Sequence, residues 1–283
     1  MDFQDIWKNI ENYWIARGCV LWHPYNVEVG AGTLNPATFF GILGDKRWNV
    51  VYLEPSARPA DGRYGDNPVR LYLHHQIQTI MKPPPADIQE MYIQSLAAVG
   101  IKVAEHDLRF MEDNWEAPTL GAWGVGWEVW LDGLEITQFT YMQQAGGIDL
   151  VPPAVEITYG LDRIAAFLQG TRSVFDLAWA GDIRFGDLLH ERERQYSCYA
   201  FDEADTGFLL DLFGRCETEA ERLLEKGLYV PAYDYVLKLS HLFNLLDARK
   251  AVSVSERVRF IGRVRKLARR CAELYLSAGR GII

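Results

Sequence analysis

The sequence predicts an α+β fold, in which an antiparallel sheet flanked by helices is followed by an all-helical domain. Three observations predict it. The strand-like apolar runs are not each followed by a helix, which disfavours a doubly wound parallel sheet. Asp132-Gly133 separates two apolar runs, a pattern typical of a β-hairpin. After about residue 180 the strand signals fade, and only helical periodicity remains.

The C-terminal part of the chain contains three helical stretches, near 203–226, 231–247 and 252–277. Ser253 and Glu256 stand three residues apart at the head of the last stretch, where they can form a capping box. We therefore expect two domains, with the sheet in residues 1–180 and the helices in residues 181–283.

Within the first 180 residues, periodicity and breaker residues set the expected boundaries of helices and strands. The expected helices are 3–18, a short one opened by Asn35-Pro36-Ala37, 88–99 and 161–168. The expected strands are 48–53, 71–81, 106–112, 127–131, 134–142 and 152–159. Residues 59–70 are dense in Gly, Pro, Asp and Arg, which indicates a mobile loop.

The composition restricts the possible partners. The chain has 283 residues, of which 49% are hydrophobic and 13% aromatic, enough for a large core. Its formal net charge is -9, whereas a protein that holds nucleic acid by itself usually has a basic surface. We therefore expect any nucleic acid to contact a partner or one local patch of this chain.

The cysteines and the N-terminal residues bear on the compartment. The four cysteines are widely spaced and include no C-x-x-C pair, so we expect no zinc site. The first residues carry acids where a signal peptide needs a basic stretch. No apolar run approaches the ~20 residues of a membrane span. A cytoplasmic protein with reduced thiols and no membrane contact is expected.

The most informative segment runs from Val155 to Arg163, where an extended run meets a helix. Gly160 would let a flat ligand lie against the backbone. Arg163 could reach from the first helical turn and bind a phosphate with its planar guanidinium. The alternative is a glycine that only packs the start of a helix.

A second candidate region links Arg58 to the strand that carries Gln76 and Gln78. Residues two apart in a strand point to the same face, so the two amides lie together. Amides on a largely apolar strand are costly unless they meet polar groups. They form either a buried hydrogen-bond network or part of a polar pocket for a small ligand.

Residues 113–128 alternate three glycines with three tryptophans, Trp115, Trp123 and Trp127. Glycine-rich backbone between aromatic rings can wall a very small cavity. The alternative is a loop whose tryptophans fill core, which is the commoner position for a tryptophan.

Glu135 lies on the second strand of the expected hairpin, beside Gln138. An acid on an inner face of a sheet is costly unless it meets a cation. Mg²⁺ that bridges nucleotide phosphates is one such cation. A surface position is the alternative.

Other catalytic signatures are missing from the sequence. The histidines show no H-x-x-x-H spacing, and no Ser/His/Asp or Cys/His assembly stands out. No G-x-x-x-x-G-K-[ST] loop exists. A site built from arginines, amides and carboxylates is therefore favoured over one with a nucleophilic side chain.

Along nearly its whole length the chain resembles the α subunits of bacterial tetrameric glycyl-tRNA synthetases, members of the class II aminoacyl-tRNA synthetases. The resemblance rests on long runs rather than short motifs. These runs are Glu28–Thr33, Arg58-Pro59 with Asp61–Gly65, Phe110–Trp130, Glu135–Tyr141, Glu156–Arg163 and Asp247–Ala251.

This resemblance implies the class II type of antiparallel sheet and three class motifs. The first would be the segment ending in the strand before Pro55, which would build an α–α dimer. The second would be Arg58, the loop, and the strand with Gln76 and Gln78. The third would be Gly160–Arg163.

The same resemblance implies residues that bind ATP. Arg58 would hold the α-phosphate and the glycine carboxylate, and Arg163 would hold the far phosphates of a bent ATP. Glu135 would help to bind Mg²⁺. Arg70 on the loop, or its neighbour Arg63, would touch phosphate or the tRNA end, and His74 would stack on adenine.

It also implies residues that bind glycine. Glu156 would pair with the α-ammonium group, supported by Thr158, Gln76 and Gln78. Trp115 would wall the pocket and exclude a methyl group by clash. Attraction alone would discriminate poorly, because one methylene is worth only ~1–3 kcal/mol.

The chain departs from the family pattern at four positions. Ala57 stands where a second arginine is usual beside Arg58. His74, His75 and Ile77 replace residues that are usually aromatic on the strand that stacks adenine. These departures put the placement of the ATP base in doubt.

The implied activity is activation of glycine with ATP, followed by transfer to tRNA(Gly) together with a larger β subunit that supplies most tRNA recognition. The assembly would be an α₂β₂ tetramer. Adenylation fits the residues, because the substrate carboxylate is itself the nucleophile and the enzyme supplies positioning and charge. The alternative is a class II-like paralogue that acts as an ATP-dependent amide ligase or as a ligand sensor without catalysis.

Overall fold

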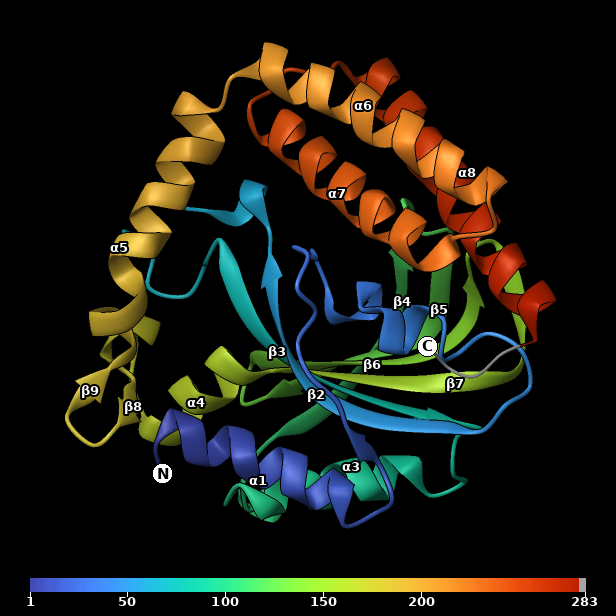
Figure 1. Ribbon diagram of the computed structural model, residues 1–283. Helices are drawn as coiled ribbons and strands as arrows, with labels where there is room; N and C mark the ends of the chain where they lie inside the picture. The colour runs from blue at the N-terminus through green and yellow to red at the C-terminus, as the bar shows by residue number, and fades with distance from the viewer. Residues whose placement is uncertain (280–283) are drawn as a thin grey trace.

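The computed structural model describes residues 1–279 and is built around one seven-stranded sheet (Figure 1). The strand order is β1-β2-β3-β7-β6-β5-β4, and every neighbouring pair is antiparallel except the short parallel pair β1–β2. The strands are β1 (Val20–Leu21), β2 (Trp48–Ala57), β3 (Leu73–Lys82), β4 (Leu108–Ala117), β5 (Ala122–Leu131), β6 (Leu134–Ala145) and β7 (Ile148–Gly160). The antiparallel sheet predicted from the sequence is therefore confirmed.

Strands β5 and β6 form the expected hairpin. Asp132 and Gly133 both have positive φ, 48° and 84°, as the tight turns that favour Asp-Gly require. Gly124 and Gly126 on β5 let the backbone of β6 approach closely, because an added Cβ would lie 2.6 Å from the Tyr141 oxygen or 2.0 Å from the Phe139 oxygen. The segment 113–128 is thus mostly paired strand, which rules out the alternative in which it forms a loop.

One face of the sheet, here called the lower face, is covered by α1 (Phe3–Ile15), α3 (Ile88–Ala98) and α4 (Leu161–Gln169) (Figure 1). Helix α1 forms as the sequence predicts, because Phe3, Ile6, Ile10 and Trp14 recur at helical spacing and all are fully buried. It ends before Gly18, whose φ is +87°. This face holds an aromatic and aliphatic core.

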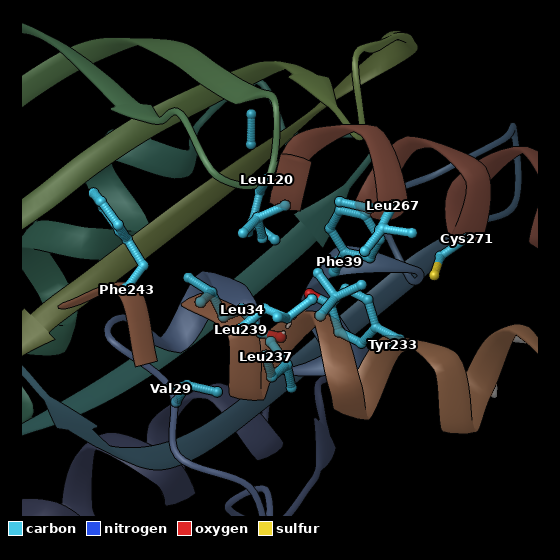
Figure 2. Close-up of a cluster of buried hydrophobic side chains, with 14 of the residues drawn as sticks. Val29, Leu34, Phe39, Leu120, Tyr233, Leu237, Leu239, Phe243, Leu267 and Cys271 are labelled. Atoms are coloured by element: carbon cyan, nitrogen blue, oxygen red, sulfur yellow. Dashed lines mark hydrogen bonds between the residues drawn. The ribbon is translucent and has the colours of Figure 1, made fainter. Parts of the chain in front are cut away.

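The opposite, upper face carries α6 (Thr206–Glu225), α7 (Tyr229–Ala248) and α8 (Val254–Ala278) (Figure 1). Helix α5 (Phe185–Cys198) leads to them along the edge of the sheet, starting in the lower-face cluster at Phe185, and a short π-helix η5 (Tyr199–Glu203) follows it. The cluster in Figure 2 joins α7 and α8 to the sheet side, where Tyr233 stacks on Phe39 at 4.6 Å between ring centres. The predicted capping box is present, since Ser253 Oγ accepts from the Glu256 N–H and the Glu256 carboxylate accepts from the Ser253 N–H.

Smaller elements complete the chain. They are α2 (Pro36–Phe39), the turns η1 (Gly32–Leu34), η2 (Pro59–Asp61), η3 (Val103–Glu105) and η4 (Val174–Asp176), and the hairpin β8 (Ala178–Ala180) with β9 (Ile183–Arg184). Helix α2 begins where expected, because Asn35 Oδ1 accepts from the Ala37 N–H at 2.9 Å.

Several boundaries differ from those predicted, and one helix was not predicted. Strand β2 continues through Pro55 to Ala57, and beyond the short pairing with β1 at Val50 and Val51 its outer edge meets Val29, which bridges Ser56. Strand β4 runs on to Ala117. Helix α5 was not predicted, because its buried positions are only Phe185, Glu193 and Ser197, which make no apolar stripe.

Candidate functional site

A cavity of about 240 Å³ opens on the upper face of the sheet, where β3, β6 and β7 meet the start of α4. Charged, amide and hydroxyl side chains dominate its walls. Its lining residues are Ala31, Thr33, Arg58, Val69, His74, His75, Gln76, Gln78, Trp115, Glu135, Ile136, Thr137, Gln138, Thr158, Gly160, Asp162 and Arg163. Eight of the ten residues expected to bind ATP or glycine are in this list, and Arg70 and Glu156 are not.

The two arginines supply positive charge to the cavity. Arg58 Nε donates to the Gly30 carbonyl at 3.0 Å, and the Arg58 N–H donates to the Tyr72 carbonyl at 2.7 Å, so its position is fixed. Burial lowers the pKa of the Arg58 guanidinium, and the positive charge of Arg163 contributes to that lowering. The two positive charges repel each other, so an anion bound between or beside them would be stabilised.

Arg163 is held by Glu135. Its Nη1 lies 2.6 Å from Glu135 Oε2 and 3.0 Å from the Glu135 carbonyl oxygen. Both side chains stay partly exposed, at 39% for Arg163 and 31% for Glu135, so ligands can reach them. Glu135, the acid expected to need a cation, is therefore paired with Arg163, and it lines the cavity.

The two glutamines of β3 point to the same face, as predicted, and both are buried. Gln76 Oε1 accepts from the Gly32 N–H at 3.1 Å and from Ser56 Oγ at 3.0 Å. Gln78 Oε1 accepts from Thr158 Oγ1 at 2.6 Å, whereas Gln78 Nε2 is buried with no hydrogen-bond partner in the described part of the chain. An orphaned amide N–H on a cavity wall is a donor available to a ligand.

The loop through Gly32 packs directly on β3 and contributes Ala31 and Thr33 to the cavity wall. A Cβ built on Gly32 would lie 2.1 Å from Gln78 Cγ, so only glycine fits here. The Gly32 carbonyl accepts from Tyr52 Oη at 2.9 Å. The loop is therefore held between two buried side chains of the sheet.

Glu156 lies beneath the cavity wall instead of lining it. It is 2% exposed, and its Oε1 accepts from Thr33 Oγ1 at 2.7 Å. Burial raises the pKa of the Glu156 carboxyl to about 7, while the Thr33 hydrogen bond acts to lower it. Thr33, which lines the cavity, connects this carboxyl to the space where a ligand would sit.

Trp115 is the one tryptophan of the 113–128 segment that lines the cavity. It belongs to β4 and packs against the upper core. Trp123 is 43% exposed, and Trp127 lies in the lower-face aromatic cluster with Phe110 and Phe139. Of the two interpretations of the alternating segment, a cavity wall describes Trp115 and core packing describes Trp127.

Gly160 lines the cavity with open space above its Cα. A Cβ placed there would meet nothing closer than the Ile136 oxygen at 3.4 Å, an ordinary contact. Tight packing of the helix start does not therefore explain the glycine, and a flat ligand could lie against it. Asp162, two residues on, accepts from the His75 N–H and contacts His75 Nδ1, both at 2.9 Å, which ties α4 to β3.

His74, His75 and Ile77, the residues of β3 that depart from the family pattern, lie on two different faces of the strand. His74 lines the cavity, with its Nε2 buried and 3.7 Å from Asp61 Oδ2, too long for a hydrogen bond. Ile77 is in the lower-face core, and the His75 ring packs edge-on against Phe3 there. His75 also contributes to the cavity wall, although its ring is packed in the lower-face core. Of these three departures, His74 alone has its side chain on the cavity face.

Arg70 lies outside the cavity. Its side chain is 55% exposed, and its Nε is 3.7 Å from Asp61 Oδ1. Arg63, the other loop arginine, donates to the carbonyls of Ala60 and Gly62.

A metal in this site would have few protein ligands. Residues 1–279 contain no group of three or more His, Cys, Asp or Glu side chains arranged to hold a metal ion. Glu135 is the acidic residue of the cavity that offers an exposed carboxylate oxygen beside arginine. Mg²⁺ is often held by one or two carboxylates together with substrate phosphates, so this donor set fits it.

Several cavity residues were not predicted as ligands. Thr33 and Asp162 gave no periodic or motif signal of their own, although both fall within runs that carried the family resemblance. Gln138 was noted only as a neighbour of Glu135, and its Nε2 donates to Asp113 Oδ2 at 3.1 Å.

Comparisons with known proteins agree with one another. A family model described as glycyl-tRNA synthetase alpha subunit matches residues 3–280. The glycine–tRNA ligase alpha subunit of Coprothermobacter proteolyticus is 59% identical over 277 residues, which cover 98% of this chain and 95% of that protein.

Among solved structures, the chain is similar to two structures of the pyrrolysyl-tRNA synthetase of Desulfitobacterium hafniense. Their TM-scores are 0.43 and 0.45, at 13% and 15% identity. They cover 65% and 66% of this chain, and the match spans 76% of each of those chains. Separately, none of the helices in residues 1–279 is long and apolar enough to span a membrane.

Proposed function

This chain belongs to the glycyl-tRNA synthetase alpha subunit family, and from that premise we propose that its upper-face cavity is where glycine and ATP react. The activity is that of an aminoacyl-tRNA synthetase, a ligase that joins glycine to tRNA. In the first step a glycine carboxylate oxygen attacks the α-phosphorus of ATP, and pyrophosphate leaves. In the second, a ribose hydroxyl of the tRNA end attacks the carbonyl carbon, and AMP leaves.

The observation that carries the site assignment is the pair Arg58 and Arg163 in one cavity with the β3 glutamines. Arg58, fixed by Gly30 and Tyr72, would hold the α-phosphate and the glycine carboxylate. Arg163 would hold the far phosphates, exchanging part of its bond to Glu135 for them. Preorganised positive charge of this kind stabilises the charge that spreads over phosphate in the transition state.

Glycine would lie between Thr158, the β3 glutamines and Trp115. We propose that Glu156 supplies the negative charge for its α-ammonium group, with the Thr33 hydroxyl as the contact between them. Gln78 Nε2, a donor without a partner in residues 1–279, would bind the carboxylate side of the substrate. Trp115 would close the space in which a side chain larger than hydrogen would have to fit.

Mg²⁺ would be held by Glu135 and the ATP phosphates, and it would neutralise phosphate charge when bound. His74 would stack on adenine, because its ring is the one altered β3 side chain on the cavity face. Arg70 would act at the rim, on phosphate or the tRNA end, since it is exposed outside the cavity.

An alpha subunit implies a β subunit as partner. We propose an α₂β₂ tetramer in which β provides most of the tRNA contact, the β2 region forms an α–α dimer, and the enzyme works in the cytoplasm. We further propose that residues 1–180 carry adenylation and that 181–283, whose last four residues lie outside the described part, carry the partner contacts. The paralogue alternative is disfavoured by 59% identity to a glycine–tRNA ligase alpha subunit over nearly all of the chain.

Glycine-dependent exchange between ATP and pyrophosphate tests the site. The purified chain is assayed with and without its β subunit, with alanine and serine as control amino acids. We expect exchange with glycine alone. Exchange that is absent in both mixtures, or equal with all three amino acids, would contradict the assigned chemistry.

A further inference from the structure

Helix α5 lies along the loop that joins β2 to β3, although none of its residues, 185–198, lines the cavity (Figure 1). A Cβ built on Gly65 would lie 2.9 Å from His190 Nε2, and a Cβ built on Gly62 would lie 2.6 Å from Ser197 Oγ. His190 and Ser197 are two turns apart, so they share one face of the helix. That face of α5 therefore packs directly on the loop.

Glu193 lies on the same face and is 3% exposed. Its Oε2 accepts from the Tyr72 N–H at 2.6 Å, and its Oε1 accepts from the Leu73 N–H at 2.9 Å. Within residues 1–279 these two backbone groups are its hydrogen-bond donors. Burial raises the pKa of the Glu193 carboxyl, and the two N–H groups act to lower it. Both oxygens of a buried acid are thus used to hold the backbone where β3 begins.

The pairing of β2 with β3 explains why an acceptor is needed at this place. The Arg58 N–H donates to the Tyr72 carbonyl at 2.7 Å, which is one of the two bonds that a facing antiparallel pair exchanges. The other bond would run from the Tyr72 N–H to the Arg58 carbonyl, but that carbonyl accepts from the Asp61 N–H at 2.9 Å. The chain also bends at Tyr72. Glu193 therefore replaces the acceptor that is lost when Arg58 turns out of the strand.

The bend at Tyr72 sets the positions of two cavity residues. Arg58 is bonded through its N–H to the Tyr72 carbonyl, and His74 follows two residues later. The Tyr72 ring is buried and stacks on Tyr196 of α5, with ring centres 4.9 Å apart. Helix α5 thus holds Tyr72 by its backbone and by its ring. A buried N–H left without an acceptor is costly, so loss of the Glu193 carboxylate should shift this backbone.

We propose that Glu193 is a positioning residue for the adenylation of glycine, because it fixes the bend from which Arg58 is held. This inference rests on the proposed function, in which Arg58 holds the α-phosphate and the glycine carboxylate. Glu193 touches no substrate and acts through Tyr72 and Arg58. Adenylation needs aligned reactants, and a displacement of about 1 Å can cost about 10²-fold in rate. The reaction would then depend on a residue of the helical part of the chain.

The substitution Glu193→Gln tests this in the assembled α and β chains, because glutamine has the same shape but only one acceptor oxygen. We expect kcat for glycine-dependent ATP–pyrophosphate exchange to fall about tenfold or more. The rate is expressed per active site, counted from the glycyl-adenylate formed in a single turnover. The KM values for glycine and ATP should stay within about twofold of wild type, because the other ligand contacts remain.

Asp187→Asn is the matched control. Asp187 is also on α5, and its carboxylate accepts from a backbone N–H, that of Arg184, at 2.8 Å. This bond lies at the exposed start of the helix and does not involve β3. The control should keep the wild-type kcat per active site. A merely structural role of Glu193 would lower the midpoint of thermal unfolding or the number of active sites, and it would leave kcat per site unchanged.

A kcat per site within about twofold of wild type in Glu193→Gln would overturn the proposal. So would an equal fall in Asp187→Asn, or a rise in KM at unchanged kcat. If Glu193→Gln gives no folded protein, Glu193→Asp replaces it, because this variant keeps the charge but is too short to reach both N–H groups. The same fall in kcat is expected there, and wild-type kcat would again overturn the proposal. Failure of the proposed function would appear separately, as no exchange in the wild-type enzyme.

Discussion

Strand β3 has two faces that meet opposite requirements. On its upper face, His74, Gln76 and Gln78 line the cavity and keep donors or acceptors within reach of a ligand. On its lower face, Ile77 is fully buried in an aliphatic and aromatic core. His75 and Thr79 are the polar residues of that face, and the His75 ring nitrogen is paired with Asp162 at 2.9 Å.

The difference lies in where the unpaired polar atoms sit. On the lower face Asp162 pairs His75, and the one further polar side chain, Thr79, has its Oγ1 enclosed in the core without a partner in residues 1–279. On the upper face, Gln78 Nε2 and His74 Nε2 have no partner within the same residues, and both side chains line the cavity. Unpaired buried groups cost stability in the free protein. We infer that the upper face forgoes stability for binding, and that substitutions on the two faces should separate activity from folding.

The largest expected effect is on the upper face. Replacing Arg163 by alanine should lower the rate of glycine-dependent exchange by roughly 10²- to 10³-fold, because a preorganised charge on the phosphates is lost. The midpoint of thermal unfolding should change little. Arg109→Ala is the control, since Arg109 is an exposed arginine paired with Asp107 on β4. An Arg163→Ala enzyme with full exchange activity would refute the site.

Two buried glutamates sharpen the comparison through pH. Burial raises the pKa of Glu54 and of Glu156 to about 7, above their ordinary value of 4.5. Between these values the folded chain keeps a proton that the unfolded chain has lost, so folding stability should fall as pH rises. Each glutamate should contribute on the order of 3 kcal/mol to this fall. Urea unfolding between pH 4.5 and 8 measures it, and Glu54→Gln or Glu156→Gln should flatten the curve.

Only one of these glutamates should matter to glycine. Glu54 accepts from Tyr25 and Asn35 away from the cavity, whereas Glu156 reaches it through Thr33. The KM for glycine should fall as pH rises through about 7, because Glu156 must be ionised to attract an ammonium group. Glu156→Gln should abolish that dependence and Glu54→Gln should keep it. The same glycine profile in both variants would remove Glu156 from the site.

A smaller effect is expected for selectivity. Trp115→Ala should enlarge the cavity and reduce discrimination between glycine and alanine by about 10-fold or more, the range for one methylene. The ratio of kcat/KM for the two amino acids in exchange measures this. Trp123→Ala serves as the matched control, because Trp123 is exposed on the neighbouring strand. Unchanged discrimination in Trp115→Ala would show that another residue sets the size limit.

The smallest effect belongs to the lower face. Ile77→Val should reduce the free energy of unfolding by about 0.5–1.5 kcal/mol, the usual loss for one buried methyl group. The KM values for glycine and ATP should not change, because this side chain points away from the cavity. A shift in KM without a loss of stability would break the division between the two faces.

Much of this division could be predicted from the sequence. The two-residue spacing of Gln76 and Gln78, the Gly160–Arg163 motif and the Asp-Gly hairpin are local patterns, and local patterns set strands and turns. The family resemblance then grouped Arg58, Trp115 and Glu135 around one cavity, which no spacing rule connects.

The remaining features depend on packing between distant segments. Thr33 reaches Glu156 across 123 positions of sequence, so no periodicity could reveal their contact. Glu156 and Thr158 lie on the same face of β7, but Glu156 is buried while Thr158 lines the cavity. Which of two such residues is buried depends on the segments that cover the strand. Helix α5 buries an acid and a serine rather than an apolar stripe, so the hydrophobic pattern that identifies helices was missing.

The contact between Gly32 and Gln78 has a consequence for redesign of the enzyme. Because a single methyl group at position 32 would overlap Gln78 Cγ, a library randomised at that codon alone should return only glycine. Shortening residue 78 first would open the space and allow alanine or serine at 32. Any attempt to place another residue at position 32 must therefore vary codons 32 and 78 together, because the loop and the strand can change only as a pair.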